Sequence, residues 1–286
     1  MIERLRYIRL PTGDLTAAVA FSRNVLGLQN SGESEDNVRF RSNEHAYSLE
    51  FDQSGRTSAP VVGFEVRFEA QLDEVADALS QQGLTFSRLS SGACEAGLFA
   101  EGLCFQDHSG NLIELVVRPH NKGRRFFPSR DTGLTGLQRV ALRSTHIVAD
   151  TALWTQALGL RATDYVGGGV YLTMDDAHHR VALHPSPRNG LLSIGFGAED
   201  LDAIMQNRYW LEEHQIRIVF GPGREPTSGA VTLAFEGPEG SVFTLGTEMR
   251  SLGSDWRPRQ FAHEAASFCG WGSPNAIMEL AGGQDR

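Results

Sequence analysis

Three histidines, His178, His179 and His184, lie close together in the segment DAHHRVALHP. Imidazole nitrogens bind transition metals and transfer protons near neutral pH, so this cluster indicates either a metal site or acid–base chemistry. Successive side chains of a strand point to opposite faces, so His178 and His179 cannot both enter one cavity. We therefore favour a polar pocket wall or a solvent-facing edge over a metal site in this segment.

Two other groups of residues have compositions associated with chemistry but are better explained as structure. The glycine run at 166–170 resembles a phosphate-binding loop only in composition, because the strand–GxGxxG–helix context is missing. We interpret it as a hairpin turn. Cys94, Cys104 and Cys269 form no close pair, which disfavours a disulfide framework or a cysteine-rich zinc site and favours the reducing cytoplasm.

The elements that must position these side chains occur twice along the chain. Residues 14–28, DLTAAVAFSRNVLGL, are similar to residues 146–160, HIVADTALWTQALGL, and both segments end in Leu-Gly-Leu at an offset of 132 residues. GNLIEL at 110–115 is similar to GSVFTL at 240–245, at an offset of 130. Two separate markers displaced by nearly the same distance indicate a duplicated domain.

Within each copy we expect a strand, a helix and several strands, twice over. Asp14 is a suitable N-cap for the first helix, and Gly27 supplies its end. The expected helices span 15–26, 72–79 and 201–214, with a fourth that ends at 158; the expected strands span 6–10, 38–40, 47–51, 61–68, 84–86, 103–106, 112–117, 139–142, 170–173, 180–184, 192–196, 217–220, 231–235 and 242–245. Because several strands follow each helix, we predict mainly antiparallel α+β modules rather than a parallel α/β sheet.

The net charge and the distribution of apolar residues disfavour two classes of partner, nucleic acids and membranes. The chain has 286 residues and a net charge of -9, with a pI of about 5.5. An acidic protein lacks the basic face that nucleic acids and anionic membranes require, so we expect neither as a partner. No window approaches about 18 consecutive apolar residues, and the first ten residues have no signal-peptide core, so we expect a cytoplasmic protein.

The repeated motifs resemble the vicinal oxygen chelate superfamily, which includes glyoxalase I, bleomycin-resistance proteins and type I extradiol dioxygenases. The similarity rests on D-L-x-x-A-x-x-F…L-G-L from residue 14 and F-x-D-x-x-G-N-x-I-E-L at 105–115. The chain length and the DAHHRVALHP segment narrow it to the two-domain extradiol type. This resemblance implies an α+β fold with two tandem domains, each a pair of βαβββ modules that form a cup-shaped mixed or antiparallel sheet. It gives domains at 1–118 and 137–248, a linker at 119–136 and a tail at 249–286.

In the extradiol enzymes the C-terminal cup holds Fe(II) through two histidines and one glutamate. The resemblance places Arg139, Ser193 and Thr244 at those three positions. Arginine is a permanent cation, and neither hydroxyl is a normal ligand for Fe(II), so we expect no metal and no cofactor. The family's closing carboxylate in the N-terminal domain corresponds to Glu114, which we interpret as structural.

The resemblance also suggests roles for the residues of the C-terminal cup. His179 matches a position that the family uses for proton transfer. Glu225 is either a general base or the counter-ion of Arg139, and Arg139 is either an anchor for a carboxylate or phenolate or one half of that ion pair. Arg139, Ser193, Thr244 and His178 are the expected substrate-binding residues, with His179 and Glu225 as the candidate catalytic ones.

Three functional hypotheses follow from the resemblance. We favour an extradiol-dioxygenase-like protein that binds an aromatic or phenolic small molecule in its C-terminal cup without the usual Fe(II) catechol-cleaving chemistry. One alternative is an active metal-dependent dioxygenase with displaced ligands His178, His184 and Glu248. The other is a non-catalytic, ligand-sequestering protein of the bleomycin-resistance type. A homo-oligomer is compatible with all three, and whether the chain is an enzyme stays open.

The cup and the tail carry two further expectations. We expect the larger ligand-accessible cavity to lie in the C-terminal cup, since concave strand faces bind ligands in such proteins. The tail contains aromatic residues such as Phe261, Phe268 and Trp271, which indicates an ordered segment. It either closes over a pocket mouth or packs on the back of the domain, and we favour packing on the back.

Overall fold

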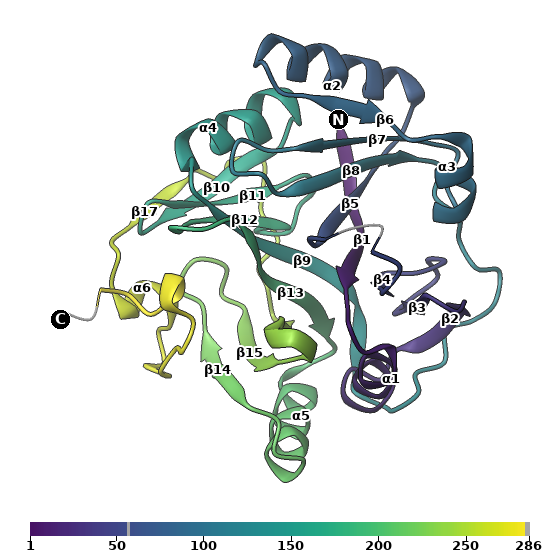
Figure 1. The fold of residues 1–286 in the computed structure, drawn as a ribbon. Coiled ribbons are helices and arrows are strands. Elements are labelled where there is room, and N and C mark those ends of the chain that lie inside the picture. Colours follow the sequence, from purple (N-terminus) through teal and green to yellow (C-terminus); the bar gives the residue numbers. More distant parts are fainter. Residues whose placement is uncertain (56–57, 284–286) are drawn as a thin grey trace.

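A computed structural model describes residues 1–55 and 58–283, which form two mixed β-sheets (Figure 1). The N-terminal sheet has the strand order β2-β3-β4-β1-β5-β8-β7-β6. Its strands are β1 (Ile2–Pro11), β2 (Gln29–Glu33), β3 (Asn37–Arg41), β4 (Leu49–Asp52), β5 (Val61–Val66), β6 (Phe86–Arg88), β7 (Glu101–Gln106) and β8 (Leu112–Val117).

The C-terminal sheet has the order β14-β15-β16-β13-β9-β12-β11-β10-β17. Its strands are β9 (Leu134–Ser144), β10 (Arg161–Val166), β11 (Gly169–Thr173), β12 (Val181–Pro185), β13 (Gly190–Ala198), β14 (Ile218–Arg224), β15 (Val231–Glu236), β16 (Val242–Thr247) and β17 (Arg259–Phe261). We propose that each sheet forms the core of one domain, the first at 1–118 and the second at 137–248. The first strand of the second sheet, β9, begins at Leu134, three residues before the proposed boundary.

Short helices separate the strands, and polar side chains cap several of them. The α-helices are α1 (Leu15–Ala20), α2 (Glu69–Gln81), α3 (Ser91–Gly97), α4 (Ile147–Ala152), α5 (Leu201–Glu213) and α6 (Ala265–Phe268), with π-helical turns η1 (Phe21–Val25) and η2 (Leu153–Ala157) and 3-10 turns η3 (Pro238–Gly240) and η4 (Met278–Leu280). As predicted, the Asp14 carboxylate accepts a hydrogen bond from Ala17 N at 2.9 Å. Asp200 caps α5 in the same way through Ala203 N.

Four βαβββ modules make up the two sheets, which confirms the predicted α+β fold. In each module the first strand runs parallel to the last, as β1 does to β4 and β9 to β12. The first strands of paired modules are antiparallel neighbours, β1 with β5 and β9 with β13. This arrangement places four first and last strands side by side in the middle of each sheet, where every second side chain faces the cup.

The predicted strands omitted the second strand of modules one and three, β2 and β10. β2 has the polar sequence QNSGE and lies at a sheet edge, where no apolar alternation is needed. β10, RATDYV, is bordered by β17 from the tail rather than by solvent. The expected hairpin turn is confirmed, because Gly167 and Gly168 join β10 to β11 with positive φ angles of 56° and 84°.

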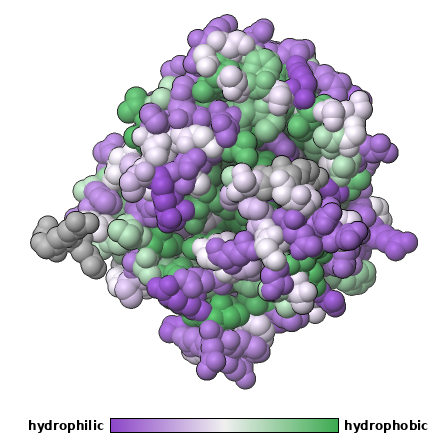
Figure 2. Space-filling view, in the orientation of Figure 1, coloured by the Kyte–Doolittle hydropathy of each residue, from purple (hydrophilic) through white to green (hydrophobic). Residues whose placement is uncertain are grey.

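One apolar core extends across both halves of the chain. The Phe21 ring lies 4.9 Å from the Phe243 ring, and Phe64 meets Trp154 edge-on at 5.5 Å, so each half buries an aromatic residue of the other. On the face drawn in Figure 2, apolar residues gather in small patches between hydrophilic ones. No helix within the described residues is long and apolar enough to cross a membrane.

Candidate functional site

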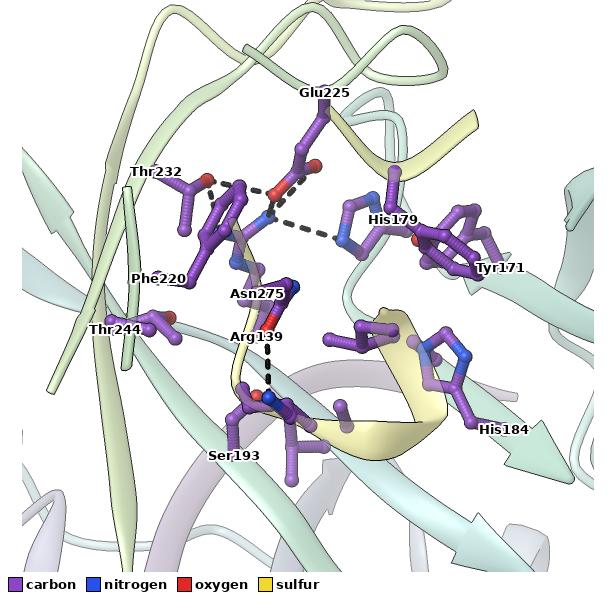
Figure 3. A pocket seen from close by; sticks show the side chains of 17 residues that line it. Arg139, Tyr171, His179, His184, Ser193, Phe220, Glu225, Thr232, Thr244 and Asn275 are labelled. Atoms are coloured by element: carbon purple, nitrogen blue, oxygen red, sulfur yellow. Dashed lines mark hydrogen bonds and ion pairs between the residues drawn. The ribbon is translucent and has the colours of Figure 1, made fainter. Parts of the chain in front are cut away.

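A cavity of about 60 Å³ lies in the cup of the C-terminal sheet (Figure 3). Its lining comes from seven strands or their flanking segments and from the tail: Arg139, Val140, Ala141, Tyr171, His179, Ala182, His184, Ser193, Phe220, Glu225, Thr232, Ala234, Thr244, Phe268, Asn275, Ile277 and Leu280. The five residues expected in this cup, Arg139, His179, Ser193, Glu225 and Thr244, are all among them. Most of the remaining side chains are apolar, so the cavity combines an apolar wall with a few polar groups.

The expectation that this cup holds the larger cavity is wrong. A broad depression of about 710 Å³ lies beside α3, near Leu89 and Phe99. Another of about 690 Å³ adjoins the tail, and it shares His184 and Ile277 with the cup. The cup is smaller because side chains from the tail occupy its mouth.

The tail closes the cup instead of packing on the back of the domain, so that expectation also needs correction. Its contribution to the cavity wall consists of Phe268, Asn275, Ile277 and Leu280. The backbone N–H of Ala276 donates to Val219 O at 2.8 Å, which fastens the tail along β14. The apolar residues of this segment were the signal in the sequence, but nothing local indicated which surface they would cover.

An ion pair between Arg139 and Glu225 lies at one end of the cavity. Arg139 Nη1 is 2.9 Å from Glu225 Oε1 and 3.2 Å from Oε2, while Nη2 donates to Thr232 Oγ1 at 2.7 Å. Glu225 also accepts from the hydroxyls of Ser228, at 2.6 Å, and Thr232, at 2.7 Å. Burial raises the pKa of Glu225, but Arg139 and the two hydroxyls outweigh burial, so the net pKa lies below its usual value.

These contacts favour the counter-ion role of Glu225 over the general-base role. Its two oxygens already accept hydrogen bonds from three residues, and a carboxylate with a lowered pKa is a weak base at neutral pH. Both Nη atoms of Arg139 are likewise engaged, by Glu225, His179 and Thr232, and Glu225 compensates the charge inside the protein. The guanidinium is therefore a poor anchor for an anionic ligand.

A chain of hydrogen bonds fixes the tautomer of His179. Arg139 Nη1 lies 3.3 Å from His179 Nε2, and because arginine can only donate, Nε2 accepts. The His179 proton is then on Nδ1, which lies 3.0 Å from His178 Nδ1. His178 accepts there and donates from Nε2 to Asp164 Oδ2 at 2.9 Å. Burial and then the charge of Arg139 hold the pKa of His179 well below its usual range, so its ring is neutral at pH 7.

His178 does not line the cavity, so its expected role in substrate binding is wrong. It is fully buried, paired with Asp164 and packed edge-on against Trp256 with ring centroids 5.7 Å apart. His178 and His179 both precede β12 and their Nδ1 atoms lie 3.0 Å apart, but only His179 lines the cavity. His184 also faces the cup, and burial lowers its pKa to about 4. The sequence predicts His184 individually only as a displaced metal ligand, not as a named residue of the pocket wall.

The register of the central strands corrects one aligned position. Arg139 on β9 pairs with Gly195 on β13, and Gly195 pairs with Thr244 on β16. Gly195, not Ser193, is therefore the residue in line with Arg139 and Thr244 on the floor of the cup. A Cβ at position 195 would lie 2.4 Å from Arg139 Cγ, so glycine is needed for the arginine stem to cross β13. Ser193 lies two residues before Gly195 on β13, pairs with Ala141 on β9 and lines the same cavity.

The N-terminal cup repeats this arrangement with other residues. Tyr7, Gly63 and Glu114 pair across β1, β5 and β8, and a Cβ at Gly63 would lie 2.3 Å from the Tyr7 ring. Glu114 is buried, accepts from the Tyr7 hydroxyl and lies 3.1 Å from Arg9 Nη1. The Tyr47 ring lies tilted against the Tyr7 ring, with centroids 5.0 Å apart. This packing agrees with a structural role for Glu114.

The donor set of the C-terminal cup does not fit a divalent metal ion. Arg139 brings a fixed positive charge to the floor, Gly195 has no donor, and Thr244 offers a neutral hydroxyl. The displaced ligands considered for a dioxygenase do not converge either. His178 is turned toward Asp164, and Glu248 pairs with Arg224 at 2.6 Å on the surface. Within residues 1–55 and 58–283, no three His, Cys, Asp or Glu side chains form a group that could hold a metal.

Comparisons with known proteins agree with the two-cup fold. The chain is 24% identical over 282 residues to 3-methylcatechol 2,3-dioxygenase of Pseudomonas putida, which covers 89% of this chain and 93% of the relative. It is 24% identical over 299 residues to an iron-dependent extradiol dioxygenase of Rhodococcus jostii, with 95% and 96% covered. The crystal structure of BphC, a halotolerant catechol dioxygenase, superposes with a TM-score of 0.85 at 18% identity, over 98% of this chain and 95% of that one, a likeness that concerns the fold alone.

The family comparison covers both halves of the chain. The sequence profile described as Glyoxalase/Bleomycin resistance protein/Dioxygenase superfamily matches residues 4–115 and again 136–245. The two matches correspond to the two sheets and to the duplicated motifs of the sequence. The chain therefore belongs to the glyoxalase/bleomycin resistance protein/dioxygenase superfamily.

Proposed function

We propose that the C-terminal cup binds a small aromatic or phenolic molecule without Fe(II). The observation that carries this proposal is the buried Arg139–Glu225 pair, at 2.9 Å, at one end of a cup with otherwise mainly apolar walls. Apolar walls with a few placed polar groups are typical of small-molecule sites. The relative from Pseudomonas putida is a 3-methylcatechol 2,3-dioxygenase, and another relative is a biphenyl-2,3-diol 1,2-dioxygenase, which supports an aromatic ligand.

Binding, rather than catalysis, is the function that we favour for the cup. Both candidate catalytic groups are engaged within the protein, because His179 Nε2 accepts from Arg139 and Glu225 is held as a carboxylate. A general base must reach the proton that it removes with a free lone pair. The structure therefore supports a role of the ligand-sequestering kind more than one in acid–base chemistry.

Entry of such a ligand requires the tail to move. A volume of about 60 Å³ holds a few water molecules. An aromatic ring needs more space, since a cavity that binds benzene measures about 150 Å³. The tail is held by separate contacts, among them Glu279 to Arg143 Nε at 2.7 Å and Glu279 to Ser186 Oγ at 3.0 Å. We propose that ligand binding displaces Ile277 and Leu280 from the cup.

Two measurements on the purified chain test this proposal. The protein is loaded anaerobically with Fe(II), analysed for bound metal and assayed for catechol cleavage. We expect no stoichiometric iron and no ring-cleaved product. About one iron per chain together with cleaved catechol would overturn the metal-free part of the proposal.

Binding is then measured by titration with phenol and with catechol. Ala234→Leu, which fills the cup, is expected to abolish binding, while the same change at Ala46 in the N-terminal half leaves it intact. Both alanines are buried, at 1% and 5% exposure, so the pair separates loss of the cup from a general effect of overpacking. Equal loss in both variants, or binding that survives Ala234→Leu, contradicts a ligand site in this cup.

The unpaired cysteines fit the location that we propose. Cys94, Cys104 and Cys269 are all free thiols in the structure. Free thiols persist in reducing compartments, which supports a cytoplasmic protein.

A further inference from the structure

The described lining of the cup carries no net charge. Its one guanidinium and its one carboxylate, Arg139 and Glu225, neutralise each other. Burial lowers the pKa values of His179 and His184, so both rings are neutral at pH 7. Burial also raises the pKa of Tyr171, so its hydroxyl stays protonated. An anion that entered this cavity would lose its hydration without gaining an unpaired cation.

Among the described residues that line this neutral cavity, one has a fully buried side-chain polar atom without a partner. Thr244 is 6% exposed, and its Oγ1 is buried without a hydrogen-bond partner among the described residues. No other lining residue has a buried side-chain nitrogen or oxygen in that state. A buried hydroxyl without a partner is unfavourable, so this atom indicates a place where a ligand can supply a hydrogen bond.

The surroundings of Thr244 Oγ1 leave this hydroxyl without a hydrogen bond. Its neighbour across β13 is Gly195, which has no side chain, and Oγ1 lies 2.9 Å from the point where a Cβ would stand. Arg139 Cγ and Nε lie 2.4 Å and 3.0 Å from the same point, but the hydrogen bonds of this arginine run from its Nη atoms to Glu225 and Thr232. In Figure 3 Thr244 lies across the cavity from Tyr171 and His184. A ring between these walls would carry its polar substituent toward Thr244.

We propose that the ligand of this cup is an uncharged aromatic molecule whose hydroxyl group hydrogen-bonds to Thr244 Oγ1. This inference rests on the proposed function and narrows its ligand to neutral phenols, to the exclusion of aromatic carboxylates. Alanine and other apolar side chains, among them Ala141, Phe220 and Ala234, contact the ring. The threonine hydroxyl both donates and accepts, so it pairs with a phenol in either direction.

The test uses ligand-observed fluorine NMR titrations with 4-fluorophenol, 4-fluorotoluene and 4-fluorobenzoate. These probes have the same ring and carry a hydroxyl, a methyl or a carboxylate. The wild-type chain should bind 4-fluorophenol most tightly and 4-fluorobenzoate at least about a hundredfold more weakly, because the carboxylate would be buried unpaired. Thr244→Val should weaken 4-fluorophenol about tenfold and leave 4-fluorotoluene unchanged.

Two further variants serve as controls. Thr244→Ser keeps the hydroxyl and should retain the preference for 4-fluorophenol, which guards against a folding defect in Thr244→Val. Thr247→Val removes a hydroxyl from the same strand at a buried residue outside the cavity lining, and it should change nothing. Equal binding of the benzoate and the phenol, or a phenol affinity unaffected by Thr244→Val, overturns the inference while the proposed function stands. If none of the three probes binds, both the inference and the proposed function are wrong.

Discussion

Replacement of Glu225 by glutamine probes the buried ion pair directly. The change removes the negative charge but keeps the size of the side chain, so Arg139 remains in the cup without its counter-ion. The side chains of Arg139 and Glu225 are 10% and 15% exposed. Little water can therefore replace the lost carboxylate.

The magnitude follows from the distance and the burial. Two unit charges 2.9 Å apart attract by roughly 6 kcal/mol at an effective dielectric constant of about 20. Removal of one partner from a buried pair destabilises proteins by about 3–5 kcal/mol. Because the pair retains slight exposure, we expect Glu225→Gln to lower the free energy of unfolding by about 3 kcal/mol.

Equilibrium urea denaturation measures this loss, and the chain offers a matched control. Glu248 pairs with Arg224 at 2.6 Å, but these side chains are 46% and 36% exposed. Glu248→Gln should therefore cost at most about 1 kcal/mol. The double variant Arg139→Met with Glu225→Gln removes both charges and should be more stable than Glu225→Gln alone.

The reasoning is refuted if Glu225→Gln and Glu248→Gln cost the same. It is also refuted if the double variant is less stable than Glu225→Gln, since the penalty would then come from packing rather than from an uncompensated charge. A third readout concerns ligands. With Glu225 neutralised, Arg139 becomes an unpaired cation, so 4-fluorobenzoate should bind Glu225→Gln more tightly than the wild-type chain.

Three other changes have expected outcomes. Gly195→Ala should lower the free energy of unfolding by about 1–3 kcal/mol in urea denaturation, because its Cβ would lie 2.4 Å from Arg139 Cγ. The control Gly32→Ala, whose Cβ would meet no atom within 4 Å, should lower it by under about 0.5 kcal/mol. The folded-state pKa of His184 is about 4 and its unfolded value about 6.5, so the unfolded chain binds a proton between these pH values and the folded one does not. The free energy of unfolding should therefore fall by up to about 3 kcal/mol as the pH drops from 6.5 to 4. The fall should be smaller in His184→Asn, and a pH profile equal to that of the wild-type chain in this variant contradicts the lowered pKa of His184. Glu279→Gln removes an ion pair that holds the tail, so the buried thiol of Cys269 should react several-fold faster with a thiol reagent, in a background where the other two cysteines are serine.

Much of the fold could be predicted from local patterns. The repeated Leu-Gly-Leu and Gly-x-x-x-x-Leu markers identified the duplication, because each copy needs the same helix end and the same closing strand. The cap at Asp14 and the hairpin at 167–168 depend on residues adjacent in sequence, and both are confirmed. β2 was missed because a polar edge strand owes its existence to pairing with β3, which no local pattern reveals.

The cup could be predicted only in part. The expectation that His178 and His179 do not both enter the cavity is correct, but its reason is not, because both residues precede β12 and their rings contact each other. His178 stays out of the cavity because it pairs with Asp164. The alignment across strands was wrong by two residues at Ser193, because register depends on bulges between β9 and β13 that the sequence does not display. In the strand register, Gly195 is the residue that pairs with both Arg139 and Thr244.

The sequence by itself determined the modules, their order and the residue types that face the C-terminal cup. Three features are visible only in the tertiary structure. Arg139 forms an ion pair with Glu225, Thr244 Oγ1 has no hydrogen-bond partner, and the tail closes the mouth of the C-terminal cup. These features join residues up to about 140 positions apart, such as Arg143 and Glu279. Periodicity and capping act within a few residues, whereas partners in a buried polar network are chosen by the packing of distant strands.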